Sequence, residues 1–175
     1  MTLQEIKFAI NNLIDELDDD EQVDTIITNA INKAIFDLSK IDKRLSSAYC
    51  PVIMGKADLP DDALEVIQIS PSLIAGERRI GNAILSNRKT TFEVMYNYAR
   101  PKLESDTDEP ELHEDLHYAI VVYACAMYFK HRKKQDISNM YMQEYQENKY
   151  AFIQNLNEDK FGDGQNEMVV CEYGY

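Results

Sequence analysis

The segment AIVVYACAMYF, residues 119–129, decides the fold of this chain, because it carries no charged side chain and has helical spacing. One stripe of the expected helix consists of Leu112, Leu116, Ala119, Ile120, Tyr123, Ala124, Met127 and Tyr128. The other side carries Val121, Val122, Cys125, Ala126 and Phe129. A helix that is apolar nearly all round lies at the centre of a bundle or in an interface. We therefore expect subunit contacts around it.

Three other segments have the spacing of amphipathic helices. Residues 23–41 carry one continuous apolar stripe, which we interpret as core contact. Residues 3–17 and 136–156 place apolar side chains three or four positions apart, which also predicts helices. The apolar positions are Leu3, Ile6, Ala9 or Ile10, Leu13 and Leu17, then Val23, Ile26, Ile27, Ala30, Ile31, Ala34, Ile35, Leu38 and Ile41, and finally Ile137, Tyr141, Tyr145, Phe152 and Leu156.

The middle of the chain has the composition of a small sheet. Prolines and a glycine between residues 50 and 60 interrupt any helix. Residues 64–70 have strand composition, while residues 80–85 and 91–98 flank an expected hairpin loop at 86–89. Apolar and polar side chains alternate in the last of these segments, which predicts one packed face. The packed residues are expected to be Phe92, Val94, Tyr96 and Tyr98.

These patterns predict a mainly α fold, with a four-helix bundle, a small antiparallel β insertion and an extended C-terminal tail. We expect a helical domain over residues 1–157, with the insertion at about 48–100, followed by a flexible link and a tail strand over 158–175. The tail strand has no partner nearby in sequence, so we expect strand addition to another protein. The expected interface residues are Met168, Val169, Val170, Glu172 and Tyr173.

The net charge of −13 comes from 31 acidic and 18 basic residues. It argues against binding that depends on neutralising DNA phosphates, which needs a basic surface. An acidic wall would instead let DNA slide through a channel without sticking. The longest apolar run is far shorter than the ~20 residues that cross a bilayer, so we expect a soluble protein made in a cytoplasm. Three widely spaced cysteines suggest neither a zinc knuckle nor a disulfide framework.

The sequence HEDLH at 113–117 matches the letters of the zinc hydrolase motif HExxH. In that motif two histidines one helical turn apart bind zinc, and the glutamate activates its water. Here a charged residue stands third in the motif, and His131 is only a lone histidine rather than a recognisable third ligand. The pair also sits at a helix start, where acidic side chains serve the dipole. We expect no catalytic residue, metal or cofactor, and keep His113 and His117 as the alternative metal ligands.

Other clusters of charged and aromatic residues have structural interpretations. The cations of 130–134 suit a helix C-terminus better than a phosphate site. The acidic run 18–21 lacks the spaced ligands and turn glycine of a calcium loop, so we interpret it as a solvated cap. Tyr141, Tyr145 and Tyr150 have acidic rather than basic neighbours, which favours packing over base stacking.

The order of several short segments resembles the head–tail adaptor proteins of tailed bacteriophages, also called connector, neck or head-completion proteins. In that family a Leu-Pro-Asp step before a strand and a Pro-Glu-Leu start of the third helix recur in this order. The resemblance covers about residues 1–157. In chain order the segments are IITNAINKAIFDL at 26–38, ADLPDD at 57–62, the strand at 91–98 with ARP at 99–101, and PELHEDLHYA at 110–119.

The resemblance implies a virion structural protein, not an enzyme. It implies that many copies, usually a dodecamer, form a ring docked under the portal protein, at the head–tail interface of the virion. The ring extends the DNA channel, through which DNA passes without sequence-specific binding, and attaches the tail or the next neck protein. The family has no membrane contact and no catalytic residue. The connection at 71–90 is a second candidate contact loop, after the tail strand.

Two alternatives come from other classes of protein. The first is a zinc-dependent hydrolase that uses His113, Glu114 and His117, which metal analysis and protease assays would identify. The second is a small acidic regulator or DNA-mimic protein, for which the charge is the argument. A mimic would form a stoichiometric complex with a nucleic-acid-binding enzyme, whereas an adaptor would form rings or bind a portal ring.

Overall fold

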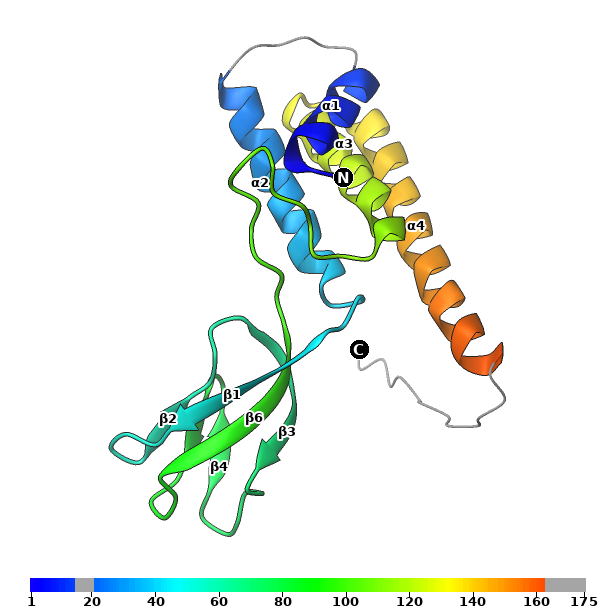
Figure 1. Cartoon of the computed structure of the whole chain (residues 1–175). Helices are drawn as coiled ribbons and strands as arrows, with labels where there is room; N and C mark the ends of the chain where they lie inside the picture. The colour runs from blue at the N-terminus through cyan, green and yellow to red at the C-terminus, as the bar shows by residue number, and fades with distance from the viewer. Residues whose placement is uncertain (15–20, 163–175) are drawn as a thin grey trace.

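The computed structural model describes residues 1–14 and 21–162, which form a helical part and a β part (Figure 1). The β part is inserted between the second and third helices. The helices are α1 (Leu3–Ile14), α2 (Glu21–Leu38), α3 (His117–His131) and α4 (Gln135–Gly162), with a short 3₁₀ turn, η1 (Glu114–Leu116), before α3. The strands are β1 (Leu45–Pro51), β2 (Lys56–Asp58), β3 (Ala63–Ser70), β4 (Arg78–Ile80), β5 (Ala83–Leu85) and β6 (Thr91–Tyr98).

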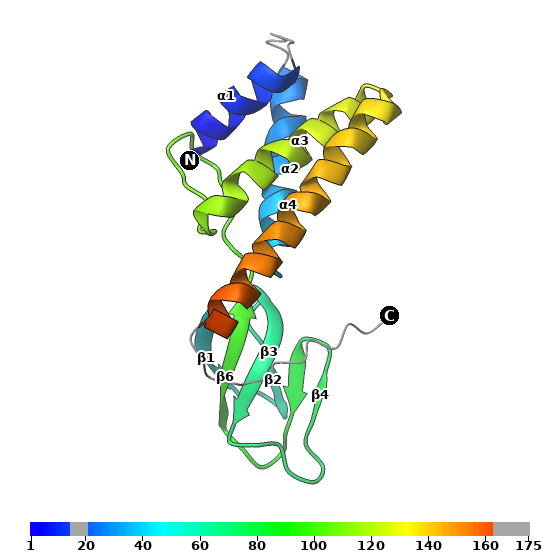
Figure 2. The same ribbon diagram turned by 90° about the vertical axis from the view of Figure 1, so that its right-hand side faces the viewer.

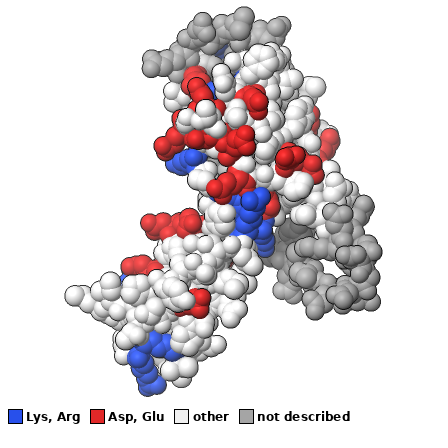
Figure 3. Space-filling view, viewed as in Figure 1, with Lys and Arg blue, Asp and Glu red and all other residues white. Residues whose placement is uncertain are grey.

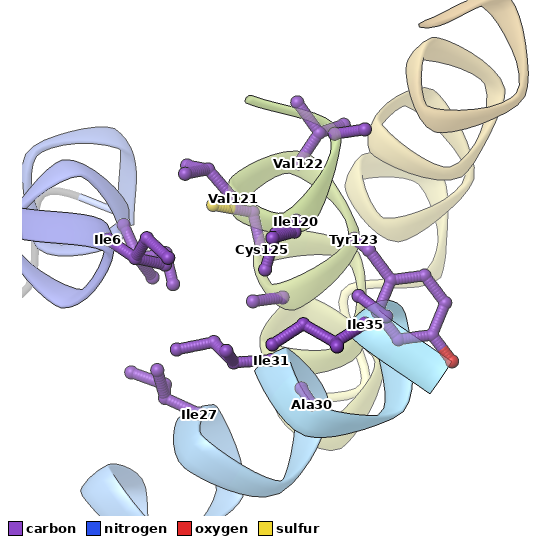
Figure 4. Close-up of a cluster of buried hydrophobic side chains, with 14 of the residues drawn as sticks. Ile6, Ile27, Ala30, Ile31, Ile35, Ile120, Val121, Val122, Tyr123 and Cys125 are labelled. Carbon is purple, nitrogen blue, oxygen red and sulfur yellow. The ribbon is translucent and has the colours of Figure 1, made fainter. Parts of the chain in front are cut away.

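α3 lies at the centre of the helical part and packs against α1, α2 and α4 (Figures 1 and 2). Every residue from Ala119 to Ala126 is buried. In Figure 4, Ile6 of α1 and Ile31 of α2 lie beside the α3 side chains that they help to cover. Burying an aliphatic side chain of this size contributes about 1.5–3 kcal/mol. The helical core therefore forms around residues 119–129, the uncharged apolar segment of α3.

Of the two positions expected for α3, the centre of the helical part is confirmed, so its apolar surface does not require the subunit contacts that we also expected. The chain covers it with its own helices, and Tyr118 is the large side chain of α3 that remains exposed. The expectation was wrong because it counted the apolar residues of this helix without the three helices that could flank it. The ring assembly that the resemblance implies would therefore need other surfaces.

The amphipathic pattern of α1 holds with one exception. Leu3 and Ile6 are buried as predicted, and Ile10 and Ile14 continue the same face. Leu13 is exposed, because a helix of 3.6 residues per turn places it beside rather than on the buried stripe. Leu17 lies outside the described residues.

The β part consists of two three-stranded antiparallel sheets, one with strand order β1-β6-β3 and one with β2-β5-β4. Their facing sides share a hydrophobic core that is separate from the helical core. From the first sheet this core contains Cys50, Phe92, Val94 and Tyr96, and from the second Ala57, Leu59 and Ile84. The alternation predicted for 91–98 is confirmed over 91–96, where Phe92, Val94 and Tyr96 are buried and Thr91, Glu93 and Met95 are exposed. It ends there, because Asn97 is buried and Tyr98, which was predicted to be packed, is half-buried.

The prediction of a mainly α fold with a four-helix bundle and a small β insertion is wrong. The structure is a mixed α/β fold, 46% helical and 22% strand, with two sheets rather than one small one. The error arose because β1, β2 and β4 are short or mostly exposed and carry weak strand patterns. They are strands because β5 and β6 supply their hydrogen-bond partners, and pairing of this kind is not visible in a local pattern.

The hairpin predicted between 80–85 and 91–98 is also wrong. β5 pairs with β2 and β4, while β6 pairs with β1 and β3, so the two strands belong to different sheets. Residues 80–85 are not one strand, because the two-residue turn Gly81–Asn82 divides them. Gly81 has a φ of 54°, which glycine adopts without strain. A tight turn inside the segment was the missed signal.

Two further predictions fall wholly or partly on undescribed residues. Residues 163–175, which include the proposed tail-strand interface of Met168, Val169, Val170, Glu172 and Tyr173, lie outside the described residues, as do Asp18 to Asp20. Among the helices of the described ranges, none is long and apolar enough to cross a membrane.

Candidate functional site

The HEDLH segment does not form one turn of α-helix. His113 has extended backbone and caps η1, and α3 begins only at His117. The Nδ1 atom of His113 accepts a hydrogen bond from the Asp115 backbone N–H at 3.3 Å, and its ring contacts Phe152. The two histidines therefore do not share the helical face that the HExxH geometry requires.

His117 is buried, and both of its ring nitrogens have partners. Nδ1 lies 3.0 Å from the N-terminal amine of Met1, and Nε2 lies 3.3 Å from the carbonyl oxygen of Leu112. Burial, together with the positive charge of the N-terminus, lowers the pKa of His117. Within residues 1–14 and 21–162 no group of three or more His, Cys, Asp or Glu side chains is arranged to hold a metal ion. The geometry of HEDLH is that of a helix entry.

The junction between the two parts is organised by Arg100, whose side chain is fully buried. Its guanidinium donates hydrogen bonds to the carbonyl oxygens of Glu111 (2.8 Å), Tyr98 (3.1 Å) and Asp42, and lies 3.6 Å from the Asp42 carboxylate. Its backbone N–H donates to the Ser39 hydroxyl. One side chain thus connects the end of α2, the end of β6 and the approach to α3.

The segments that carry the family resemblance meet at this junction, although they are far apart in sequence. The N–H of Ala99, in ARP, donates to the carbonyl oxygen of Asp62, the last residue of ADLPDD, at 2.7 Å. Arg100, in the same ARP, donates to Glu111 of PELHEDLHYA. Asn32 of the α2 segment exchanges two hydrogen bonds with the backbone of Leu103. ADLPDD, ARP and PELHEDLHYA therefore form one connected hydrogen-bonded unit, and the α2 segment is bonded to Leu103, two residues after ARP.

Residues 104–115, which we call the acidic loop, run over the helical part towards α3. The loop is held to α1 by hydrogen bonds from the Leu3 and Gln4 N–H groups to its backbone carbonyls. Backbone N–H groups of Ser105 and Glu104 bond the Asp108 carboxylate and lower its pKa. On the face in Figure 3, acidic side chains gather over the helical part. The acidic residues of the loop are Glu104, Asp106, Asp108, Glu109, Glu111, Glu114 and Asp115.

The end of the β part that lies farthest from the helices has a different chemistry. β1, β3 and β5 run away from the helices, so the connections that follow them lie together at that end (Figure 1). We call residues 52–55, 71–79 and 86–90 the distal tip. Figure 3 shows basic side chains at this end. Our second candidate contact loop, 71–90, supplies most of it.

Glu77 holds the distal tip together. Its carboxylate accepts hydrogen bonds from the Lys89 ammonium (2.7 Å), the Ser86 hydroxyl (2.6 Å) and the Ile74 N–H (3.0 Å). The hydrogen bond from Lys89 and then that from Ser86 lower the pKa of Glu77 to about 2. Only 2% of the Glu77 side chain is exposed. Two of the three tip segments are therefore fixed to one another.

The packing interpretation of the tyrosines is confirmed for two of them. Tyr145 is buried and donates to Asp37 at 2.7 Å, while Tyr141 stacks on Phe129. Tyr150 is exposed, so packing was the wrong interpretation for it. Lys130 lies in the last turn of α3, where its charge suits the helix dipole.

Sequence reasoning missed the role of Arg100 and the basic tip. A single arginine beside a proline carries no sequence signal of burial. The unequal distribution of charge was visible, since residues 104–115 contain no lysine or arginine and residues 78–89 contain four. No family model matches this chain, and no curated protein matches its sequence.

Proposed function

We propose that this chain is a head–tail connector subunit of a tailed-phage particle. In this proposal several copies form a ring under the portal protein, extend the DNA channel, and attach the tail or the next neck protein. The proposal places the protein in the virion and assigns it no catalytic step.

The observation that carries this proposal is the junction around Arg100. The motifs ADLPDD, ARP and PELHEDLHYA are short, and in the sequence their order is what they share with the family. In this fold they bond directly to one another through Asp62, Ala99, Arg100 and Glu111. Motifs that recur together and also touch form a structural unit, which supports the resemblance beyond the order of the letters.

The junction also suits the mechanical task of a ring subunit. A closed ring needs every copy to hold its surfaces at the same angle, because a small angular error repeats at each interface. Arg100 satisfies three backbone carbonyls and an ion pair, all buried or partly buried. Charged hydrogen bonds of this kind are stronger than neutral ones and geometrically specific. The acidic surface of the helical part is compatible with passing DNA without retaining it.

Mixing the purified chain with purified portal rings from the same phage genome tests the proposal. Electron microscopy should show a layer of extra density on one face of the portal ring, at a copy number set by the ring symmetry. Portal rings that remain bare at saturating protein would contradict the proposal. A stoichiometric complex with a nucleic-acid-binding enzyme, or stoichiometric zinc with hydrolase activity, would favour one of the alternatives instead.

A further inference from the structure

The distal tip combines unpaired positive charge with exposed apolar side chains. Arg78, Arg79 and Arg88 are exposed, and none of these guanidinium groups makes an ion pair with another described residue. The neighbouring Lys89 differs, because its charge is matched by Glu77. Three unpaired arginines at one end are unexpected in a protein with a net charge of −13.

The distal tip also carries exposed apolar side chains. Met54 is fully exposed, and Ile53 and Ile74 are also largely exposed. Met54 and Arg78 line a hollow of about 530 Å³, whose remaining walls come from Gly55, 76–77 and 85–87. Exposed apolar groups beside a hollow and rimmed by charge are typical of protein contact sites.

The acidic loop is the complementary surface on the same molecule. Its side chains Glu104 and Asp106 are exposed. Phe8 of α1, which is 68% exposed, lies one helical turn after Gln4, whose N–H bonds the loop backbone. An aromatic side chain close to a dense acidic stretch matches the mixture of methionine, isoleucine and arginine at the tip.

We propose that the distal tip of one copy docks on the acidic loop of a second copy. The tip lies at the far end of the β part and the loop covers the helical part (Figures 1 and 2), so the two surfaces of one chain cannot meet. A contact between two different surfaces is heterologous, and repeating it closes a ring when the rotation permits. This inference deepens the proposed function, on which it rests, by naming the contact between neighbouring copies.

Charge complementarity favours a copy of this chain over DNA as the occupant. DNA would meet the tip arginines, but it would also meet the field of a protein with a net charge of −13. The acidic loop offers carboxylates, which arginine binds in a bidentate geometry. Beside the acidic loop lies the exposed apolar side chain of Phe8, and a phosphate backbone offers no such apolar group.

Sedimentation equilibrium on the full chain tests the contact without any portal protein. We expect self-association that weakens between ~0.05 M and ~1 M salt, because the Debye length falls to about 3 Å at 1 M. The variant Arg78→Glu/Arg88→Glu should raise the dissociation constant by about tenfold or more, equivalent to about 1.4 kcal/mol. The control Lys130→Glu/Lys133→Glu makes the same change in net charge on exposed lysines at the C-terminal end of α3, away from both surfaces, and should have little effect.

A compensating variant makes the test specific for the partner surface. Glu104→Arg/Asp106→Arg alone should also weaken association, because it reverses the loop. Mixing it with Arg78→Glu/Arg88→Glu should restore association, since each variant then offers a surface that fits the other. Neither variant should associate by itself, whereas the mixture should. Only a contact between the tip and the acidic loop predicts this combination.

Four results would overturn the inference. The wild-type chain could sediment as a monomer at every concentration and salt, or the lysine control could weaken association as much as the tip variant does. The two charge-reversed variants could fail to associate when mixed, or the wild-type chain could bind duplex DNA and lose that binding in Arg78→Glu/Arg88→Glu. Portal rings fully decorated by the tip variant would also overturn it while leaving the proposed function intact. Wild-type chain that self-associates through the tip but leaves portal rings bare would contradict only the proposed function.

Discussion

Arg100 and Asp42 form the central ion pair of the junction, with 3.6 Å between the guanidinium and the carboxylate. The arginine follows the last strand of the β part, and the aspartate follows α2, so the pair lies where the chain enters and leaves the β part. Asp42 also accepts the His113 N–H at 3.1 Å, which extends the network to the start of η1. The ion pair therefore links three points of the chain: the segment that enters the β part, the segment that leaves it, and the start of η1 before α3.

Replacing Arg100 with methionine should destabilise the protein severely. Removing one partner of a buried ion pair costs about 3–5 kcal/mol, because the other partner and its neighbours lose their compensation. Here the Asp42 carboxylate and three carbonyl oxygens lose a donor. Urea unfolding of Arg100→Met against wild type measures the loss.

The matched control for Arg100→Met is Arg88→Met, which removes the same charge from an exposed site. Surface substitutions of this kind usually stay within about 0.5 kcal/mol. Equal stability of the two variants would show that the junction does not depend on Arg100.

Truncating Ile120 to alanine should destabilise the chain by about 2–5 kcal/mol, as for other buried aliphatic residues. Because α3 is covered by helices of its own chain, this loss should not depend on protein concentration. Ile137→Ala, at a partly exposed position of α4, should cost much less. Thermal unfolding over a wide concentration range checks this. In ~1 M salt, where the tip contact proposed above is screened, a stability difference between wild type and Ile120→Ala that changes steeply with concentration would place α3 in a subunit interface instead.

The contribution of Glu77 should depend on pH in a defined window. Its pKa is lowered from 4.5 to about 2 in the folded protein, first by the hydrogen bond from Lys89 and then by that from Ser86. A group whose pKa is depressed by folding stabilises the protein above its unfolded pKa, and this stability is lost as the pH falls through the folded value. The stability difference between wild type and Glu77→Gln should therefore persist above pH 4.5 and shrink towards pH 2.

Carboxyl NMR provides the direct measurement of the Glu77 titration. A Glu77 carboxyl that titrates near its ordinary pKa would contradict the described tip geometry. Two further variants each remove one donor to Glu77. Ser86→Ala should raise the pKa of Glu77 by less than Lys89→Met does, because the hydrogen bond from Lys89 is the larger cause of the lowered pKa.

Zinc should not stabilise the protein. A ligand at a hundredfold excess over its dissociation constant adds about 2.7 kcal/mol to the stability of the state that binds it. The HEDLH histidines lie off a common helical face, and both ring nitrogens of His117 are engaged. Thermal unfolding should be unchanged by equimolar zinc. Metal retained stoichiometrically by wild type but lost in His113→Ala would contradict this.

The sequence predicted the helices well because their burial is periodic and local. The buried stripe of residues 23–38 and the apolar segment 119–129 both occupy the core, as their spacing indicated. What could not be predicted was the way that α1, α2 and α4 together cover most of α3. That depends on packing between distant segments, which spacing within one helix does not encode.

The β part and the junction were harder to predict for a related reason. β4 consists of three residues, all exposed and two of them arginines. It is a strand because β5 pairs with it. Arg100 is buried because Glu111, Tyr98 and Asp42 surround it, and these residues lie on three different segments. Both features arise from long-range pairing. The concentration of basic residues in 78–89, by contrast, was readable from the sequence.

Cryo-electron microscopy of intact phage particles tests the connector assignment most directly. A reconstruction of the neck should contain a ring of this chain directly below the portal, into which the helical part, the β part and the Arg100 junction fit as one rigid subunit. Neck density that excludes this fold, in particles whose every ring is assigned to other proteins, would contradict the account.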